Sequence, residues 1–243
     1  MNPVRDKDKI FDEVSSFNEL IKIMAELRGE GGCPWDKQQD HHSIKPYLVE
    51  ETYEVLAAID EEDDQRLMEE LGDLVLQVIF HAQIAKERHA FGIKEILEGI
   101  IFKLRTRHPH VFGEEILRTP EEVLANWERI KQEERRLAGN NQGPLAGLPP
   151  GLPALLMARR IQDKLSRQGK GVIEGDASLL EERFEVFKKS LSGEDKGRIE
   201  DALADLLFLL VELARQGGID AEDALRKSLT TFSGVFDDYQ ADS

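Results

Sequence analysis

The sequence predicts an all-α protein built as a tandem repeat of one helical unit. Apolar residues recur at steps of three and four along most of the 243-residue chain, which is typical of amphipathic helices. No segment shows the alternation of β-branched residues that predicts a strand. Similar segments also occur on both sides of a glycine- and proline-rich stretch, AGNNQGPLAGLPPGLP. We therefore expect a first unit over 1–137, a linker over 138–153 and a second unit over 154–243.

The helices of the first unit can be assigned in order from their start and stop signals. An amphipathic helix is predicted from Asp12 to Arg28, and glycines end it. The stretch GGCPWDKQQDHHSIKPY then has the composition of a loop. Two carboxylate-bearing helices follow around the turn AIDEEDDQR, and a third amphipathic helix after Gly92 is stopped by Pro109. A further helix is predicted to start with Thr119 as its N-cap.

Carboxylates occur at helical spacing in both helices between Leu48 and Ala85. The first helix carries Glu50, Glu51 and Glu54, and the second carries Glu70 and Asp73. Apolar residues cover most of the circumference of the second helix, so we expect it to be buried. Its one polar stripe continues from the two acids to Gln77 and His81, of which His81 is expected to support a metal ligand through a hydrogen bond.

This acidic stripe creates a physical conflict that a cation would resolve. A carboxylate taken out of water without a partner costs several kcal/mol or takes up a proton, and neighbouring carboxylates repel one another. Divalent cations such as Mg²⁺ prefer carboxylate oxygens. The pattern favours two facing helices that build a metal site. The alternative is a solvated acidic face, as runs of charge often are.

Composition limits the classes of function. The formal net charge is −16 without a basic block, which argues against nucleic acid as a partner. There is no long uncharged apolar run and no signal-like start, so we expect a cytoplasmic protein without membrane attachment. Cys33 is the only cysteine, which excludes an internal disulfide and a thiolate metal cluster.

The repeat shows which residues the second unit lacks. LVEETYEVL at 48–56 is similar to LLEERFEVF at 179–187, and ELGDLVLQVIFHAQ at 70–83 is similar to ALADLLFLLVELAR at 202–215. In this alignment Ala202 replaces Glu70. Two cations of the first unit, Lys103 and Arg107, are replaced by Thr231 and Val235. We therefore expect the first unit to be active and the second to be structural.

These segments resemble the MazG-type nucleoside triphosphate pyrophosphohydrolases. The resemblance rests on an EExxE motif, Glu50-Glu51-x-x-Glu54, followed by an ExxD motif, Glu70-x-x-Asp73. The surrounding words GGCPWDKQQDHHSIKPYLVEE, RHPHVFGE, NWERIKQEE and LPALLMARRIQ match as well, so the likeness covers nearly the whole chain.

The resemblance implies a function, a cofactor and a role for each residue. It implies an all-α homodimer that hydrolyses nucleoside triphosphates to nucleoside monophosphate and pyrophosphate with Mg²⁺, for which Mn²⁺ can substitute. Glu50 would orient or deprotonate the attacking water, and Lys103 and Arg107 would bind the phosphates. Trp35 would stack on the base, or else anchor its loop. The implied metal ligands are Glu51, Glu54, Glu70 and Asp73.

Three alternatives follow from the same residues. A di-iron bundle needs Glu-x-x-His pairs, and Asp73 stands where the histidine would be. Zinc on His41, His42, His108 or His110 fits poorly with oxygen-rich surroundings. The third alternative is a regulatory or interaction protein that kept the fold and is weakly active or inactive, which the degenerate second unit supports.

Overall fold

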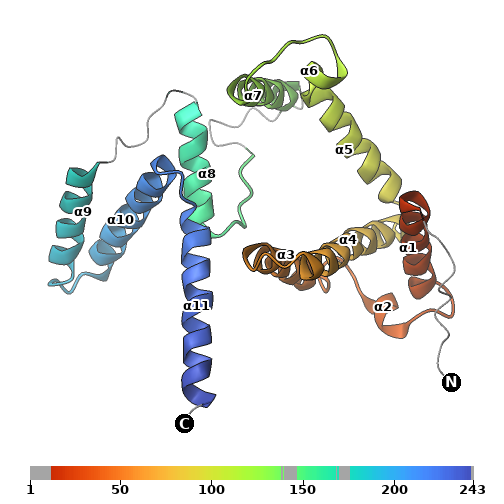
Figure 1. Cartoon of the computed structure of the whole chain (residues 1–243), viewed down its shortest axis with the longest axis horizontal. Helices are drawn as coiled ribbons and strands as arrows, with labels where there is room; N and C mark the ends of the chain where they lie inside the picture. Colours follow the sequence, from red (N-terminus) through yellow and green to blue (C-terminus); the bar gives the residue numbers. More distant parts are fainter. Residues whose placement is uncertain (1–11, 138, 140–146, 168, 170–175, 242–243) are drawn as a thin grey trace. The chain divides into compact units, whose positions relative to one another are not determined.

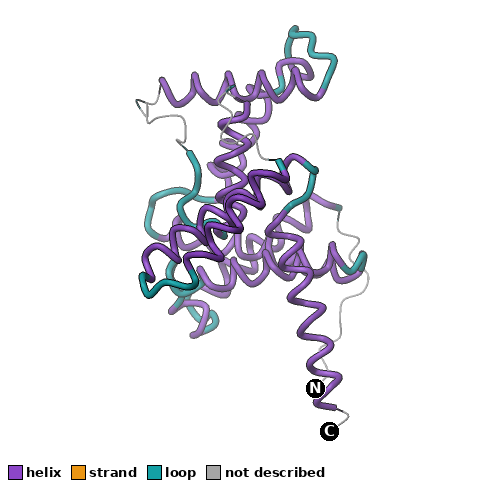
Figure 2. Tube along the Cα trace, turned by 90° about the vertical axis from the view of Figure 1, so that its left-hand side faces the viewer, coloured by secondary structure: helices purple, strands orange, loops and turns teal. Residues whose placement is uncertain are grey.

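The computed structural model describes residues 12–137, 139, 147–167, 169 and 176–241, and Figure 1 shows them as a series of helices. Within these ranges there is no strand, which Figure 2 also shows, so the all-α prediction is confirmed. The chain divides into two compact units, Met1–Lys131 and Gln132–Ser243. Most of the predicted linker, residues 138 and 140–146, lies outside the described residues.

Among its described residues, the first unit contains six helices, and a seventh begins in the first unit and ends in the second. They are α1 (Glu13–Arg28), α2 (Pro34–Gln38), α3 (Lys45–Asp60), α4 (Asp64–Glu87), α5 (Ile93–Arg107), α6 (Pro109–Phe112) and α7 (Pro120–Leu137). Side-chain caps fix two of the starts: Asp12 accepts a hydrogen bond from the Ser15 amide, and Asp63 accepts from the amides of Gln65 and Arg66. The Thr119 hydroxyl accepts from the Glu122 amide, as the predicted N-cap requires.

Two short helices differ from the sequence-based assignment. The stretch read as a loop contains α2, in which Pro34 occupies the first helical position and needs no amide partner. Pro109 ends α5, as predicted, but it also starts the single turn of α6. In both cases proline supplies a backbone angle that suits the first turn of a helix.

The core of the first unit lies where α1 packs on the C-terminal half of α4. The helices α3 and α4 form a hairpin, and α5 packs on α4. Figure 1 shows α5 leading away from this hairpin. The buried cluster consists of Met24, Ile44, Ile79, Phe80 and Ile84, against which Phe17, Leu20, Ile21, Leu76 and Ile93 pack.

The expectation that α4 is buried over most of its circumference holds only for its C-terminal half. In the N-terminal half, Leu71 is 45% exposed and Val75 is 40% exposed. The physical reason is that α3 covers only one side of this half, since α1 reaches the other end of the helix. Apolar side chains on α3, α4 and α5 are therefore left exposed, and together we call them the open apolar surface; they include Val49, Tyr53, Met68, Leu71, Val75, Val78, Ile100, Ile101 and Leu104.

The second unit has the same order of contacts as the first. Its helices are α8 (Ala154–Arg167), α9 (Ala177–Ser190), α10 (Lys196–Gln216) and α11 (Ala221–Ala241). The hairpin here is α9 with α10, and both α8 and α11 pack on α10. These pairs correspond to α3 with α4, α1 on α4 and α5 on α4. A duplication of one unit remains a prediction, and the matching contacts agree with it.

No helix among the described residues combines the length and the apolar character needed to span a membrane.

Candidate metal centre

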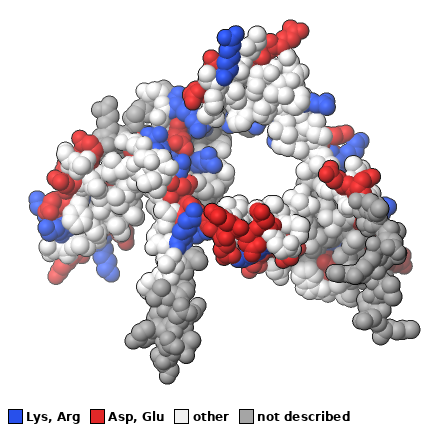
Figure 3. All heavy atoms as spheres, in the orientation of Figure 1, with Lys and Arg blue, Asp and Glu red and all other residues white. Residues whose placement is uncertain are grey.

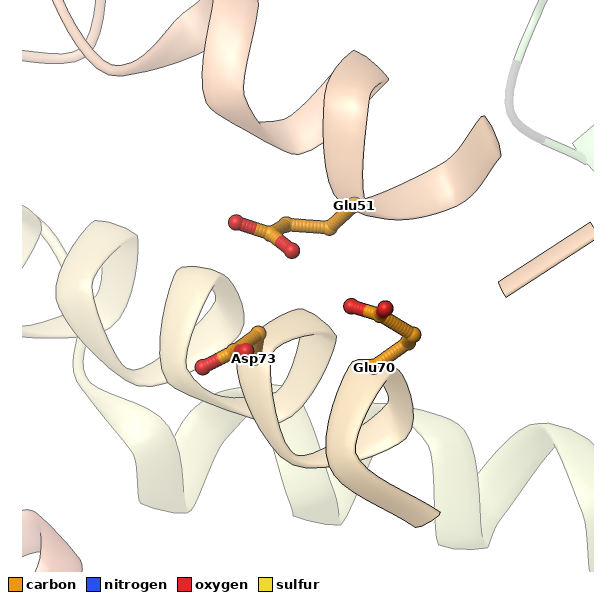
Figure 4. A group of neighbouring side chains, drawn as sticks. All are labelled: Glu51, Glu70 and Asp73. Carbon is orange, nitrogen blue, oxygen red and sulfur yellow. The ribbon is translucent and has the colours of Figure 1, made fainter. Parts of the chain in front are cut away.

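Three carboxylates from two helices converge on one point of the α3–α4 hairpin. Glu51 extends from α3, and Glu70 and Asp73 extend from adjacent turns of α4 to meet it (Figure 4). One oxygen of each lies within 4.8 Å of the others. Figure 3 shows acidic side chains gathered over this hairpin. The structure thus brings together three of the four predicted metal ligands.

The electrostatics of this acidic cluster are dominated by repulsion between closely spaced carboxylates. Burial raises the pKa of the Glu51 carboxyl, and the nearby carboxylates of Asp73, Glu54 and Glu70 raise it further. Glu51 and Glu70 are half-buried, whereas Asp73 is exposed. Three carboxylates with one open side suit a hard divalent cation that keeps water or phosphate oxygens as its other ligands. The donor set therefore fits Mg²⁺ or Mn²⁺ and does not fit zinc as a first choice.

The other two acids of the EExxE motif lie at the edge of the cluster. The carboxyl of Glu54, one turn along α3, helps to raise the pKa of Glu51, but it is exposed and is not one of the three converging groups. Glu50 is also exposed. Their roles as fourth ligand and as general base stay predictions.

Arg66 is a cation at this cluster that the sequence-based assignment did not include. Its Nε lies 3.3 Å from Oε1 of Glu70, and its Nη1 lies 2.5 Å from Oε2 of Glu61. These contacts hold a guanidinium beside one of the converging carboxylates. The signal was present in the sequence, because Arg66 and Glu70 stand four residues apart on a helix.

The structure does not bring Lys103 and Arg107 to the cluster of their own chain. Both lie in the last turns of α5, which packs on α4 and α6 and makes no packing contact with α3. Trp35 is 51% exposed on α2, and its ring centroid lies 6.2 Å from that of Tyr47. Tyr47 lies one helical turn before Glu51, so this pair of rings stands next to the cluster along α3.

The expected support of a metal ligand by His81 is wrong. Nδ1 of His81 lies 2.8 Å from Nδ1 of His41, and the two rings stack with centroids 5.1 Å apart. Burial lowers the pKa of His81, and the charge of His41 lowers it further. The polar stripe of α4 therefore continues past the acids as a histidine pair that joins α4 to the turn before α3.

The second unit satisfies its acids in a different way. Buried Ala202 stands where the first unit has Glu70. The guanidinium of Arg183 lies 3.4 Å from Asp205, and the ammonium of Lys188 lies 3.1 Å from Glu185. In the alignment of α3 with α9, the positions of these two cations are taken by Thr52 and Ala57 in the first unit.

Comparisons with known proteins agree with this geometry. The MazG nucleotide pyrophosphohydrolase domain matches residues 39–112, a range that holds all five acids of the two motifs. The nucleoside triphosphate pyrophosphohydrolase/pyrophosphatase MazG of Thermotoga maritima is 44% identical over 223 residues, which cover 89% of this chain and 82% of that protein. The nucleoside triphosphate pyrophosphohydrolase of Escherichia coli K12 is 41% identical over 235 residues, which cover 92% of this chain and 86% of that protein. The nucleoside triphosphate pyrophosphohydrolase of Mycolicibacterium smegmatis is 36% identical over 209 residues, which cover 84% of this chain and 62% of that protein. With this extent of identity, and with the domain match placed on the hairpin that holds the acidic cluster, the chain belongs to the MazG nucleotide pyrophosphohydrolase family.

Proposed function

We propose that the chain hydrolyses nucleoside triphosphates to nucleoside monophosphate and pyrophosphate, with Mg²⁺ held by the N-terminal unit. The observation that carries this proposal is the convergence of Glu51, Glu70 and Asp73 in a member of this family. Relatives that align over most of the chain are named for this activity. Burial and the neighbouring carboxylates raise the pKa of Glu51, which does not happen on a well-solvated acidic face. This raised pKa supports a cation-binding site over a solvated acidic surface.

Each residue then has a role that its chemistry suits. Glu51, Glu70 and Asp73 would hold Mg²⁺, with Glu54 as the fourth carboxylate. The chemistry supplied by the metal would be charge neutralisation at the phosphate oxygens and a lower pKa of a water. Glu50, exposed on the same helix, accepts the proton of the attacking water.

Cations complete the proposed site by meeting the charge of the triphosphate. Lys103 and Arg107 are kept as phosphate-binding cations for their chemistry, since a guanidinium offers two donors in a plane and an ammonium a point charge, although they do not reach the acidic cluster of their own chain. Arg66 is the cation that already contacts the cluster, and we add it to the phosphate-binding set. Trp35 offers an exposed ring on which a base can stack.

The assignment to the N-terminal unit rests on the difference between the two acidic hairpins. The second unit has Ala202 in place of an acid, and Arg183 and Lys188 already neutralise two of those that remain. A cation therefore gains less by binding there. In the first unit, Thr52 and Ala57 bring no charge to α3, and Arg66 contacts only Glu70 of the three converging acids, so Glu51 and Asp73 still favour a bound cation.

We also propose that the active form is a homodimer. The open apolar surface on α3, α4 and α5 includes Leu71 and Val75 beside the acids of α4. Large exposed apolar patches are uncommon on monomers, and a two-fold dimer is the commonest way to cover one.

The test is pyrophosphate release from a panel of ribo- and deoxyribonucleoside triphosphates with Mg²⁺. Wild-type protein should release pyrophosphate from at least one of them, and Glu70→Ala should abolish release. Asp205→Ala, at the corresponding hairpin of the second unit, is the matched control and should retain turnover. Equal losses in both variants would contradict the assignment to the first unit. A folded wild-type protein that releases none would favour an inactive regulatory or interaction protein.

A further inference from the structure

One buried guanidinium joins three helices of the first unit, α1, α2 and α4. The side chain of Arg28, at the end of α1, is only 6% exposed. Its Nε and Nη2 donate to the carboxylate of Glu87 at the end of α4, at 2.9 and 2.7 Å. The guanidinium carbon also lies 5.4 Å from the ring centroid of Phe80 in the core. The hydrogen bonds from Arg28 lower the pKa of the Glu87 carboxyl.

The remaining nitrogen of Arg28 is directed at α2. Nη1 donates to the backbone carbonyls of Asp36 and Gln39, and the distance to the latter oxygen is 3.1 Å. Carbonyls at the end of a helix carry a partial negative charge, so a buried cation is a strong cap for them; that of Asp36 also accepts the Gln39 amide at 3.2 Å. A five-residue helix has little stability of its own, because nucleation alone is unfavourable. The position of α2 therefore depends on this contact.

Trp35 is carried by this anchored helix. The side chain of Gln39, whose carbonyl Arg28 holds, donates in turn to the carbonyl of Trp35 at 3.0 Å. The indole projects from α2 with half of its surface exposed and meets Tyr47, one turn before Glu51. A ring offered for stacking gains affinity when it is held in place before the ligand arrives, since less conformational entropy is lost on binding.

We propose that Arg28 is a positioning residue that holds Trp35 and Tyr47 as a preformed platform for the nucleobase beside the metal centre. This proposal rests on the proposed function, in which the substrate is a nucleoside triphosphate. Arg28 does not touch the substrate and acts only through α2. Tyr47 lies one turn before Glu51 on α3, so a base stacked on this platform would lie beside the metal that Glu51 helps to hold.

The experiment follows the single indole of Trp35 in full-length protein. Trp127 is the only other tryptophan, and its Nε1 makes no hydrogen bond among the described residues, so Trp127→Phe provides a background without losing one. In that background we compare Arg28→Lys, Glu87→Gln and Arg159→Lys. Lysine at 28 keeps the charge for Glu87 but lacks the fork that reaches both carbonyls of α2. Glu87→Gln removes the ion pair and leaves those carbonyl contacts possible.

Arg159→Lys is the matched control from the second unit. Arg159 likewise contacts a carboxylate, that of Asp220 at 2.9 Å, and donates to a backbone carbonyl, that of Ile219 at 3.2 Å. Unlike Arg28, it does not contact a helix that carries a tryptophan. The measurements are acrylamide quenching and fluorescence anisotropy of Trp35 without ligand, and KM and kcat for the triphosphate that the panel shows to be hydrolysed best.

Arg28→Lys should raise the quenching constant, lower the anisotropy and raise KM at least about fivefold, the factor that matches the weaker end of base–aromatic stacking, with kcat within about twofold. Glu87→Gln and Arg159→Lys should leave Trp35 and KM near wild-type values. Unchanged quenching in Arg28→Lys would overturn the anchoring of α2. Changed quenching with unchanged KM would overturn its role for the substrate. An equal KM rise in Glu87→Gln would attribute the effect to general loss of stability.

The two proposals fail separately. If wild-type protein hydrolyses no triphosphate, the proposed function is refuted and the platform has no nucleotide to receive. The quenching data would still report whether Arg28 holds α2 in place.

Discussion

Replacing Glu51 by glutamine should stabilise the metal-free protein and remove most of its response to Mg²⁺. The carboxyl of Glu51 has a raised pKa because it is partly buried and faces Asp73, Glu54 and Glu70. An amide of the same shape removes the repulsion without removing much packing. The same change removes a metal ligand, so stability and binding should move in opposite directions.

The size of the effect follows from the spacing of the acids. Two unit charges 4.8 Å apart repel by about 0.9 kcal/mol in bulk water and by roughly four times that at a protein surface. Asp73 is exposed, so the bulk-water figure applies, and two neighbours contribute about 1.5–2 kcal/mol. After a discount for screening of these partly exposed charges by solvent, we expect a gain of about 1 kcal/mol, or about 2–4 °C in Tm.

The pH dependence has a definite sign. A raised pKa means that the folded protein holds the Glu51 proton more tightly than the unfolded chain does. Its stabilising contribution is complete below the unfolded pKa and is lost as pH rises through the folded pKa, which lies above the ordinary range of glutamate. Metal-free wild-type protein should therefore lose stability through that window, and Glu51→Gln should not.

The assay is thermal unfolding followed by circular dichroism, in EDTA and in Mg²⁺. At a Mg²⁺ concentration of about 100 times Kd, wild-type protein should gain about 2.7 kcal/mol, and Glu51→Gln should gain much less. Glu182→Gln, at the corresponding position of α9, is the control and should behave like wild type in both conditions. A loss of stability in metal-free Glu51→Gln, or an undiminished response to Mg²⁺, would refute the reasoning.

Three further predictions concern contacts away from the acidic cluster. Glu87→Gln should lower stability by about 1–2 kcal/mol at neutral pH; since Arg28 lowers the pKa of Glu87, this difference should shrink as pH falls through that lowered pKa, which denaturant titrations at several pH values would measure. Val75→Glu should give a monomer by light scattering where wild-type protein is a dimer, and a monomeric wild type would contradict the proposed interface. The pKa of His81 is lowered, so its pairing with His41 stabilises the fold above the ordinary histidine range, and this stabilisation is lost as pH falls through the lowered pKa. His81→Leu should therefore flatten the fall in Tm between about pH 7.5 and 5.5. An unchanged slope would show that other groups cause the fall.

Much of the fold was readable because its signals are local. The cap at Asp12 and the proline after α5 act within one turn of the residues they affect. The meeting of Glu51 with Glu70 and Asp73 was also predictable, since two helices joined by a short acidic turn must form a hairpin and their acids share its facing side.

What the sequence did not reveal depends on contacts between distant segments. Apolar residues all around α4 indicated burial, but Leu71 stays 45% exposed because α1 and α3 do not cover its side of the helix. His81 lies on the acidic stripe, yet a residue 40 positions earlier determines what it binds. The role of Arg28 was equally hidden, because its partners at α2 and Glu87 come together only through packing of α1 on α4.

The second unit carries its counter-ions in its own sequence. Arg183 and Lys188 stand beside Asp205 and Glu185, at positions where the first unit has uncharged residues. Covalently attached cations cannot diffuse away, so the hairpin of α9 and α10 keeps its charge balance whatever the supply of divalent ions. In the hairpin of α3 and α4, Arg66 contacts Glu70, but among the described residues no ion pair reaches Glu51 or Asp73. The charge balance of the α3–α4 hairpin therefore depends in part on ions from the medium, whereas that of the α9–α10 hairpin depends on side chains of the chain itself.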